Sequence, residues 1–159
     1  MGPKEKGCIF CNALKSKKKD DKKLVLYRGK TAFVIMNKYP YNSGHVMVVP
    51  NRHTGTILKL KEDESLDFME LIKLTTKVIN KTLKPNSFNI GMNMGRGAGA
   101  GIPYHMHMHI VPRWAEDTNF MPVISKTRVV SFGLDLIYGM LKKGFDAECR
   151  DVKSQPKRS

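Results

Sequence analysis

The pattern of apolar and polar positions divides the chain into short extended segments and two helical ones. Apolar or alternating runs bounded by turn-forming residues predict five β-strands, at residues 24–27, 31–36, 45–49, 88–94 and 105–111. The first two strands are expected to form a hairpin that turns at residues 28–30. Residues 37–44 are dense in turn formers and predict a loop before the third strand.

A helical period replaces this alternation from about residue 63 to residue 83. One stripe of that helix would contain Phe68, Ile72, Thr75, Ile79 and Leu83. Lys84-Pro85 is expected to end the helix, because the residue before a proline disfavours helical geometry. A short last helix is predicted at residues 134–143. The order β-β-β-α-β-β, followed by this helix, predicts an α+β domain with an antiparallel sheet of about five strands.

Length and charge set the wider bounds. The 159 residues suit one domain over 1–159, with a core at about 8–145 and a basic tail at 146–159. The formal net charge of +14 predicts attraction to polyanions such as nucleotides and nucleic acid. Nucleic acid is the less favoured partner, because no aromatic residues interleave with the lysine-rich segment 15–23. The absence of a long apolar run or a secretion signal predicts a cytoplasmic protein with no membrane partner.

The segment at 105–111 alternates imidazole and apolar side chains. One face of an extended strand would carry His105, His107 and His109, and the other would carry Met106, Met108 and Ile110. Three imidazoles are poor core material, because each has a donor and an acceptor that need partners. Imidazole also exchanges protons and attacks electrophiles near neutral pH. The histidine row therefore predicts a site that faces a ligand, a metal or a proton.

A glycine-rich loop precedes the histidine row. Residues 95–101 contain four glycines, which let a backbone approach a ligand closely and turn N–H groups towards an anion. The spacing matches neither a P-loop nor a dinucleotide-binding fingerprint. A flexible hairpin loop would also explain the glycines, but the position beside three histidines favours a phosphate cradle.

Cys8 and Cys11 form a Cys-x-x-Cys pair, which is typical of a metal knuckle or a redox pair. The two thiolates, His53 and one histidine of the row would complete a Cys2His2 zinc site. A thioredoxin-like redox pair, which would need a βαβ context, and two inert cysteines are the alternatives. His45 begins the third strand and joins the imidazole cluster if that strand lies near the histidine row.

Several motifs together resemble one known family. His105-Met106-His107-Met108-His109-Ile110-Val111 resembles the signature of the histidine triad family of nucleotide hydrolases and transferases. Residues 8–11 resemble the zinc knuckle of many bacterial members, residues 37–50 the loop and strand that hold the nucleoside, and residues 89–95 the strand before the triad. Residues 112–114 and 117–121 resemble the branch that contains diadenosine tetraphosphate phosphorylases and related hydrolases. The similarity extends across almost all of residues 8–125.

The resemblance implies a role for each matching side chain. His107 would attack the α-phosphorus and form a nucleotidyl-imidazole intermediate. His109 and His45 would stabilise or orient the phosphate and the nucleophile. Asn93 would hydrogen-bond the phosphate or leaving group, and Asn37 would contact the ribose. The implied activity is cleavage of a dinucleoside polyphosphate, with transfer of the nucleotidyl group to phosphate or water.

The resemblance also implies binding sites and partners. The glycine-rich loop, with Gly99, Ala100 and Gly101, would cradle the second phosphate group. The substrate would be an adenosine-containing nucleotide, no organic cofactor is expected, and the protein would be a homodimer to which the apolar residues 120–124 could contribute. A structural zinc ion would be held by Cys8, Cys11, His53 and His105.

Three alternatives stay open. Gly97 and Gly101 stand where some phosphorylases have Ser or Thr, which leaves open whether phosphate or water accepts the nucleotidyl group and whether the substrate is a smaller, phosphoramidate-type adenylate. The three histidines of the row could instead bind one catalytic metal. The chain could also bind nucleotides or nucleic acid with little turnover. Trp114 and Arg113 could touch a substrate or serve only in packing and surface pairing, and neither is assigned to catalysis.

Overall fold

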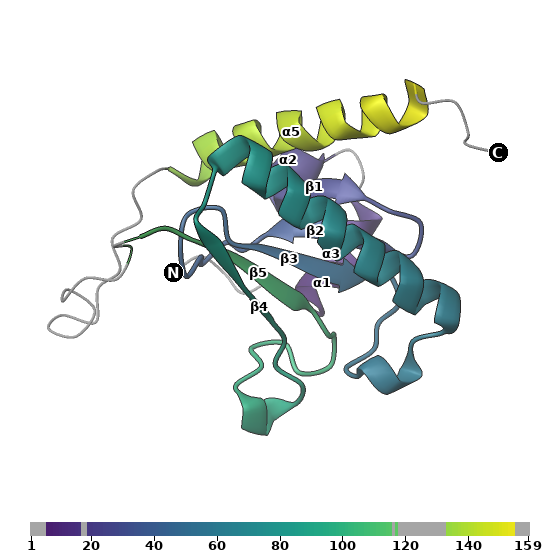
Figure 1. The fold of residues 1–159 in the computed structure, drawn as a ribbon. Coiled ribbons are helices and arrows are strands. Elements are labelled where there is room, and N and C mark those ends of the chain that lie inside the picture. The colour runs from purple at the N-terminus through teal and green to yellow at the C-terminus, as the bar shows by residue number, and fades with distance from the viewer. Residues whose placement is uncertain (1–5, 17–18, 116, 118–132, 155–159) are drawn as a thin grey trace, which may run out of the picture.

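The protein is built on a five-stranded antiparallel sheet with the strand order β1-β2-β3-β5-β4 (Figure 1). The computed structural model describes residues 6–16, 19–115, 117 and 133–154. The strands are β1 (Val25–Arg28), β2 (Ala32–Met36), β3 (Val46–Pro50), β4 (Ser87–Gly91) and β5 (Met108–Arg113). The sheet and the predicted hairpin of the first two strands are therefore confirmed. The segment 120–124 and most of the motif at 117–121 lie outside the described residues.

Helices cover both faces of the sheet (Figure 1). One face packs against α3 (Glu62–Leu83) and α5 (Leu134–Ser154), and the other packs against α1 (Ile9–Lys15). The short helix α2 (Asp20–Lys23) precedes β1, the 3₁₀ turn η2 (Ile57–Lys59) precedes α3, and the turn η3 (Arg96–Ala98) lies between β4 and β5. Within the described part of the chain, no helix has the length and apolar character needed to cross a membrane.

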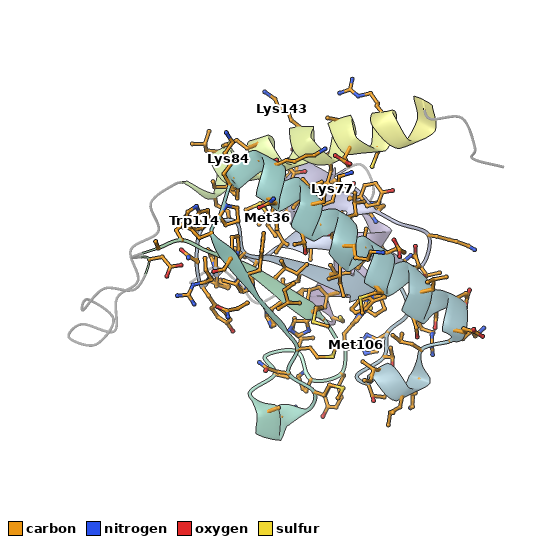
Figure 2. The ribbon with its side chains drawn as sticks, in the orientation of Figure 1. Met36, Lys77, Lys84, Met106, Trp114 and Lys143 are labelled. Carbon is orange, nitrogen blue, oxygen red and sulfur yellow. The ribbon has the colours of Figure 1, made fainter. Side chains whose placement is uncertain are left out.

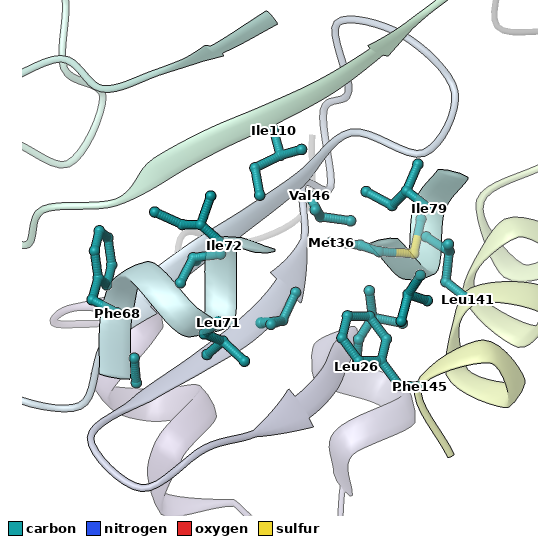
Figure 3. Close-up of a cluster of buried hydrophobic side chains, with 14 of the residues drawn as sticks. Leu26, Met36, Val46, Phe68, Leu71, Ile72, Ile79, Ile110, Leu141 and Phe145 are labelled. Atoms are coloured by element: carbon teal, nitrogen blue, oxygen red, sulfur yellow. The ribbon is translucent and has the colours of Figure 1, made fainter. Parts of the chain in front are cut away.

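The larger core lies between the sheet and the two long helices. Figure 3 shows side chains of α3 and α5 meeting those of the sheet, and Met36 and Met106 of the same cluster are labelled in Figure 2. Burying each such side chain contributes about 1.5–3 kcal/mol to folding. The predicted stripe of α3 is confirmed at Phe68, Ile72, Thr75 and Ile79, which are buried. Leu83, at the end of the stripe, is only partly buried.

Strand alternation decides which side chains reach which core. Val46 and Val48 of β3 enter the α3 cluster, whereas Met47 and Val49 enter the α1 cluster, because successive residues of a strand point to opposite faces. His45 lies two residues before Met47 and therefore points to the same face of the sheet. The α1 face is therefore the one on which histidine side chains gather.

The last helix is longer than predicted. The pattern indicated residues 134–143, but α5 continues to Ser154, so residues 146–154 of the expected tail are helical. The apolar stripe of Ile137, Leu141 and Phe145 is followed at the next buried position by Glu148, whose side chain is only 5% exposed. Lys77 and Lys81 of α3 pair with this carboxylate. The hydrophobic pattern did not predict the continuation of the helix, because the next buried position is occupied by a charged residue.

The two strands beside the glycine-rich loop are shorter than predicted. β4 ends at Gly91 and not at residue 94, and β5 begins at Met108 and not at residue 105. In the segment predicted as the fourth strand, the apolar residues Ile90 and Met94 are 47% and 45% exposed. β4 is one of the two edge strands of this sheet, and α3 packs mainly over β2 and β3. The Met106 N–H donates to the carbonyl of Thr54 (2.6 Å), outside the sheet.

Replacement of two glycines of α5 by alanine is expected to change the free energy of unfolding in opposite directions. A Cβ at Gly144 would lie 2.7 Å from Thr82 Oγ1 and 2.9 Å from Val78 Cγ1, whereas one at Gly139 meets nothing within 4 Å. We expect Gly144→Ala to lower the free energy of unfolding by about 1–2 kcal/mol, because α5 must move away from α3. Gly139→Ala should raise it by about 0.5–1 kcal/mol, because alanine is the better helix former. Urea titrations would measure both, and equal effects would contradict the close helix crossing.

Candidate active site and metal centre

Three of the predicted histidines meet on the α1 face of the sheet. β3 pairs with β5 in a register that places Met47 opposite His109. His45 Nε2 lies 2.9 Å from His109 Nδ1, and the rings of His107 and His109 are edge to face with centroids 4.9 Å apart. His45 and His107 are buried. The structure thus brings together side chains from two strands that are separated by the long helix in sequence.

Hydrogen bonds assign the protons of His45 and His109. The backbone N–H of Tyr41 donates to His45 Nδ1 at 3.0 Å, so this nitrogen is an acceptor. The proton of neutral His45 is then on Nε2, which donates to His109 Nδ1. His109 in turn carries its proton on Nε2. Asn37 Nδ2 lies 3.3 Å from His45 Nδ1, which places this predicted ribose ligand behind the His45 ring.

His107 has the opposite tautomer. Its Nδ1 lies 2.9 Å from the backbone carbonyl oxygen of His105, and a carbonyl can only accept, so Nδ1 carries the proton. The Nε2 lone pair is left available. A neutral imidazole held in this tautomer is a competent nucleophile near pH 7. The sequence alone could not indicate this assignment, because it depends on one backbone carbonyl.

The predicted metal ligands also meet. Cys8 Sγ lies 3.3 Å and Cys11 Sγ 3.7 Å from His105 Nδ1, and His53 Nδ1 lies 3.3 Å from Cys11 Sγ. The four ligand atoms all lie within 4.8 Å of one another. In a tetrahedral site with Zn–S near 2.3 Å and Zn–N near 2.0–2.1 Å, sulfur and nitrogen ligands are about 3.6 Å apart. These residues fit zinc.

The surroundings of the four ligands support the same assignment. His105 Nε2 lies 2.9 Å from the carbonyl oxygen of Pro50 and donates to it, which directs the Nδ1 lone pair towards the two sulfur atoms. Burial is the main cause that lowers the pKa of His105, which favours the neutral form that binds metal. Burial, with the neighbouring Cys8, raises the pKa of Cys11, so zinc binding would displace a thiol proton.

Arg52 connects the metal ligands to the long helix. It follows β3 directly before His53, and its guanidinium bonds both carboxylate oxygens of Glu64 at 2.9 and 2.5 Å. Glu64 also accepts from the Lys61 N–H at the start of α3. The arginine bond holds the pKa of Glu64 at about 2. The loop that carries His53 is therefore positioned by the first turn of α3.

The predicted phosphate cradle is the least formed part of the site. Gly99 N–H donates to the Arg96 carbonyl (3.0 Å) and Ala100 N–H to the Gly95 carbonyl (3.3 Å), so both amides are engaged within the loop. Gly101 is exposed. Asn93 is half-buried and follows β4 by two residues. Since β4 pairs Gly91 with His109, continuing this register would place Asn93 opposite His107.

Two aromatic residues that pack on the histidines were not predicted from the sequence to belong to the site. Phe10, between the two cysteines, is buried with its ring 5.3 Å from that of His105 and 5.1 Å from that of His107. The Tyr41 ring lies 4.7 Å from that of His45 and stacks at 5.7 Å on His109. Their positions within the Cys-x-x-Cys knuckle and just before the third strand were the available signals.

Arg113 and Trp114 lie at the far end of β5. Arg113 bonds both carboxylate oxygens of Asp117 (2.7 and 2.6 Å) and the Asn89 side-chain oxygen (2.8 Å). This arginine holds the pKa of Asp117 at about 2. Trp114 is half-buried, and its backbone N–H donates to the same Asp117 carboxylate at 3.0 Å. These contacts agree with a packing and pairing role for both residues.

The pH response of His109 is a direct test of the cluster. Burial, and to a lesser extent the nearby His107, lower the pKa of His109 from 6.5 to about 4. In the unfolded chain the group keeps its ordinary pKa, so between pH 6.5 and 4 the unfolded state binds the proton first and this contribution to stability is lost as the pH falls. An NMR titration of the imidazole Cε1–H, assigned with His109→Gln, should give a midpoint near 4; a midpoint near 6.5 would contradict the burial.

Comparisons with known proteins agree with this geometry. The family model described as "HIT domain" matches residues 18–116, more than half of the chain. An "AP-4-A phosphorylase" of Mycobacterium tuberculosis is 40% identical over 111 residues, which are 70% of this chain and 57% of that protein. The chain therefore spans just over half the length of that curated relative.

Solved structures share the fold. A hypothetical histidine triad nucleotide-binding protein of Sulfolobus tokodaii superimposes with a TM-score of 0.70 and 25% identity, covering 92% of this chain and 94% of that one. A Zn-bound histidine triad family protein of Mycobacterium smegmatis gives a TM-score of 0.71 at 18% identity, covering 92% and 97%. On the family match and the identity to its curated relatives, this chain belongs to the HIT domain family.

Proposed function

We propose that this protein cleaves a dinucleoside polyphosphate of the diadenosine tetraphosphate type at the α-phosphorus, through a covalent intermediate on His107. The observation that carries the proposal is the hydrogen bond of His107 Nδ1 to the His105 carbonyl, which places the proton of a neutral ring on Nδ1 and leaves the Nε2 lone pair available. The 40% identity to a protein named AP-4-A phosphorylase supports the substrate class. The nucleotidyl group would then pass to inorganic phosphate or to water.

The attack on the α-phosphorus needs no separate general base. The Nε2 lone pair of His107 forms a P–N bond while the bond from the α-phosphorus to the bridging oxygen breaks, and the remaining polyphosphate leaves with the electron pair. The Nδ1 proton stays hydrogen-bonded to the His105 carbonyl throughout. Phosphate or water then attacks the phosphorus and breaks the P–N bond, whose electron pair returns to Nε2; when water attacks, the proton it loses passes to solvent. Splitting one displacement into two lowers each barrier.

The neighbouring side chains would orient the phosphate. His109 Nε2–H would donate to a phosphate oxygen, because its Nδ1 is occupied by His45, and a donor fixed in advance stabilises charge that develops on that oxygen. Asn93 would reach the phosphate or the leaving group, and Asn37 the ribose. Gly99, Ala100 and Gly101 would contact the second phosphate only after the amides of the first two leave their partners in the loop.

Product analysis tests this proposal. Incubation with diadenosine tetraphosphate and inorganic phosphate is expected to yield ADP and ATP if phosphate is the acceptor, and AMP and ATP if water is. Two ADP molecules formed from water would contradict attack at the α-phosphorus. Tight nucleotide binding without any product would instead favour a binding protein with little turnover, and cleavage of adenosine phosphoramidate alone would favour a smaller adenylate as the substrate.

We also propose that zinc occupies the site of Cys8, Cys11, His53 and His105. The distances fit a tetrahedral ion, and the Mycobacterium smegmatis protein of the same fold is Zn-bound. The ion would stabilise the packing of α1 on the sheet and would take no part in the reaction.

A homodimer is the proposed assembly. In the described part of the chain β4 is an edge strand, and Ile90 within it and Met94 just after it are exposed. An open, apolar edge is suited to pairing with a second copy. Sedimentation of the protein and of an Ile90→Lys variant would test this, with the variant expected to sediment as a monomer. The cytoplasmic location and the minor nucleic-acid partner stay predictions from the sequence.

A further inference from the structure

The loop between β4 and β5 contains one cation, Arg96. Residues 92–107 include no lysine, aspartate or glutamate. The Arg96 guanidinium carbon lies 5.5 Å from the ring centroid of Tyr104, and Nη2 lies 3.5 Å from the tyrosine hydroxyl. Both residues are exposed, and the tyrosine is 63% exposed. The arginine is thus held by one exposed cation–π contact and one long hydrogen bond, neither of which involves a charge of opposite sign.

The surroundings place this arginine beside the histidine cluster. Tyr104 directly precedes His105, and its backbone packs tightly on Gly55, where a Cβ would lie 3.2 Å from the Tyr104 Cα. Arg96 follows Asn93 by three residues, and three residues span at most about 10 Å. The last pair of the β4–β5 register is Gly91 with His109, and continuing it would place Asn93 opposite His107. The loop that carries Arg96 therefore joins the histidine cluster in sequence at both of its ends.

The histidines themselves supply little positive charge to an anionic substrate. The bond that His45 Nδ1 accepts describes a neutral ring, and burial keeps His109 neutral at pH 7, with a pKa of about 4. Arg113 is occupied by Asp117. A polyphosphate chain that leaves the α-phosphorus would carry several negative charges that this cluster does not balance.

We propose that Arg96 binds the phosphates beyond the α-phosphate and thereby selects substrates with a long polyphosphate chain. The inference rests on the proposed function of the site. A guanidinium bonds a phosphate through two charge-assisted hydrogen bonds, which are stronger than a cation–π contact at an exposed ring. Gly95 and Gly99, with φ of 83° and 79°, flank the arginine turn and allow its backbone to reorient. Tyr104 holds the arginine until phosphate takes its place.

Nucleotide binding tests the proposal without requiring turnover. Calorimetry would compare adenosine tetraphosphate with AMP on the wild-type protein and on Arg96→Gln. We expect the variant to bind the tetraphosphate about tenfold more weakly, which is about 1.4 kcal/mol, and AMP within about twofold of wild type. Arg96→Lys should lie between the two, because it keeps the charge and loses the paired donors. The loss should shrink as salt is added, since the site is exposed.

Arg150→Gln is the matched control. It removes the same charge from an exposed position on α5, a helix that packs on α3 and on β1 at the opposite edge of the sheet from β4. We expect wild-type binding of both nucleotides by this variant. An equal loss for AMP and the tetraphosphate in Arg96→Gln, or no loss for the tetraphosphate, would overturn the proposal. Absence of diadenosine tetraphosphate turnover in the wild type would reject the proposed function, while the binding comparison still decides on Arg96.

Discussion

Replacement of His107 by alanine is expected to lower kcat/KM for diadenosine tetraphosphate by a factor on the order of 10⁴ or more. The physical reason is that the bond from His107 Nδ1 to the His105 carbonyl leaves the Nε2 lone pair of the neutral ring available for attack. Neighbouring His109 has its Nδ1 occupied by His45 and its proton on Nε2, so it can donate to a phosphate but cannot attack one. No other imidazole of the cluster can replace the nucleophile.

The measurement is a pair of readouts on the same variants. Steady-state kinetics would give the loss of turnover, and intact-mass analysis of acid-free, rapidly quenched samples would detect a nucleotidyl adduct on the wild-type protein. His109→Ala is the matched control, and it should lose less turnover and still form the adduct. Turnover of His107→Ala within tenfold of wild type, or an adduct mapped to another residue, would contradict the assignment.

The arrangement of the sheet was largely predictable because burial imposes a period of two on its strands. Met106 and Ile110 reach the α3 core and the histidines reach the other face, as the alternation indicated. The pattern failed where a position departs from this rule. Ile90 is apolar but exposed on an edge strand, and Glu148 is charged but buried between two lysines of α3. Both depend on partners that are distant in sequence or lie on a different element.

The candidate site was likewise predictable from the sequence only in part. The meeting of Cys8, Cys11 and His53 with one histidine of the row could be expected from residue types and spacing, because few arrangements use two thiolates and two imidazoles together. The family resemblance implied that this histidine is His105. The tautomer of His107 could not, since it depends on a main-chain oxygen. The amides of Gly99 and Ala100 were also beyond prediction, because a glycine-rich sequence permits many loop conformations and here the loop bonds to itself.

Removal of the proposed zinc ion is expected to destabilise the protein strongly while leaving its chemical groups intact. An ion present at 1,000 times its Kd contributes about 4 kcal/mol to the free energy of unfolding, because it binds only the folded state. Cys11→Ser should remove most of this contribution, since a hydroxyl is a poor zinc ligand. The measurements are the zinc content of the purified protein and its unfolding midpoint in urea, with and without a chelator.

Cys149→Ser is the matched control, because Cys149 lies on α5 and is no member of the four-residue cluster; this variant should keep one zinc ion and the wild-type midpoint. Phe10 packs on both His105 and His107, so loss of zinc should also lower turnover by loosening α1 against the nucleophile. The distinction from a catalytic metal comes from His107→Ala. If zinc were bound by the three histidines of the row, that variant would lose the ion, whereas a structural site requires that it retains the full zinc content while turnover is lost.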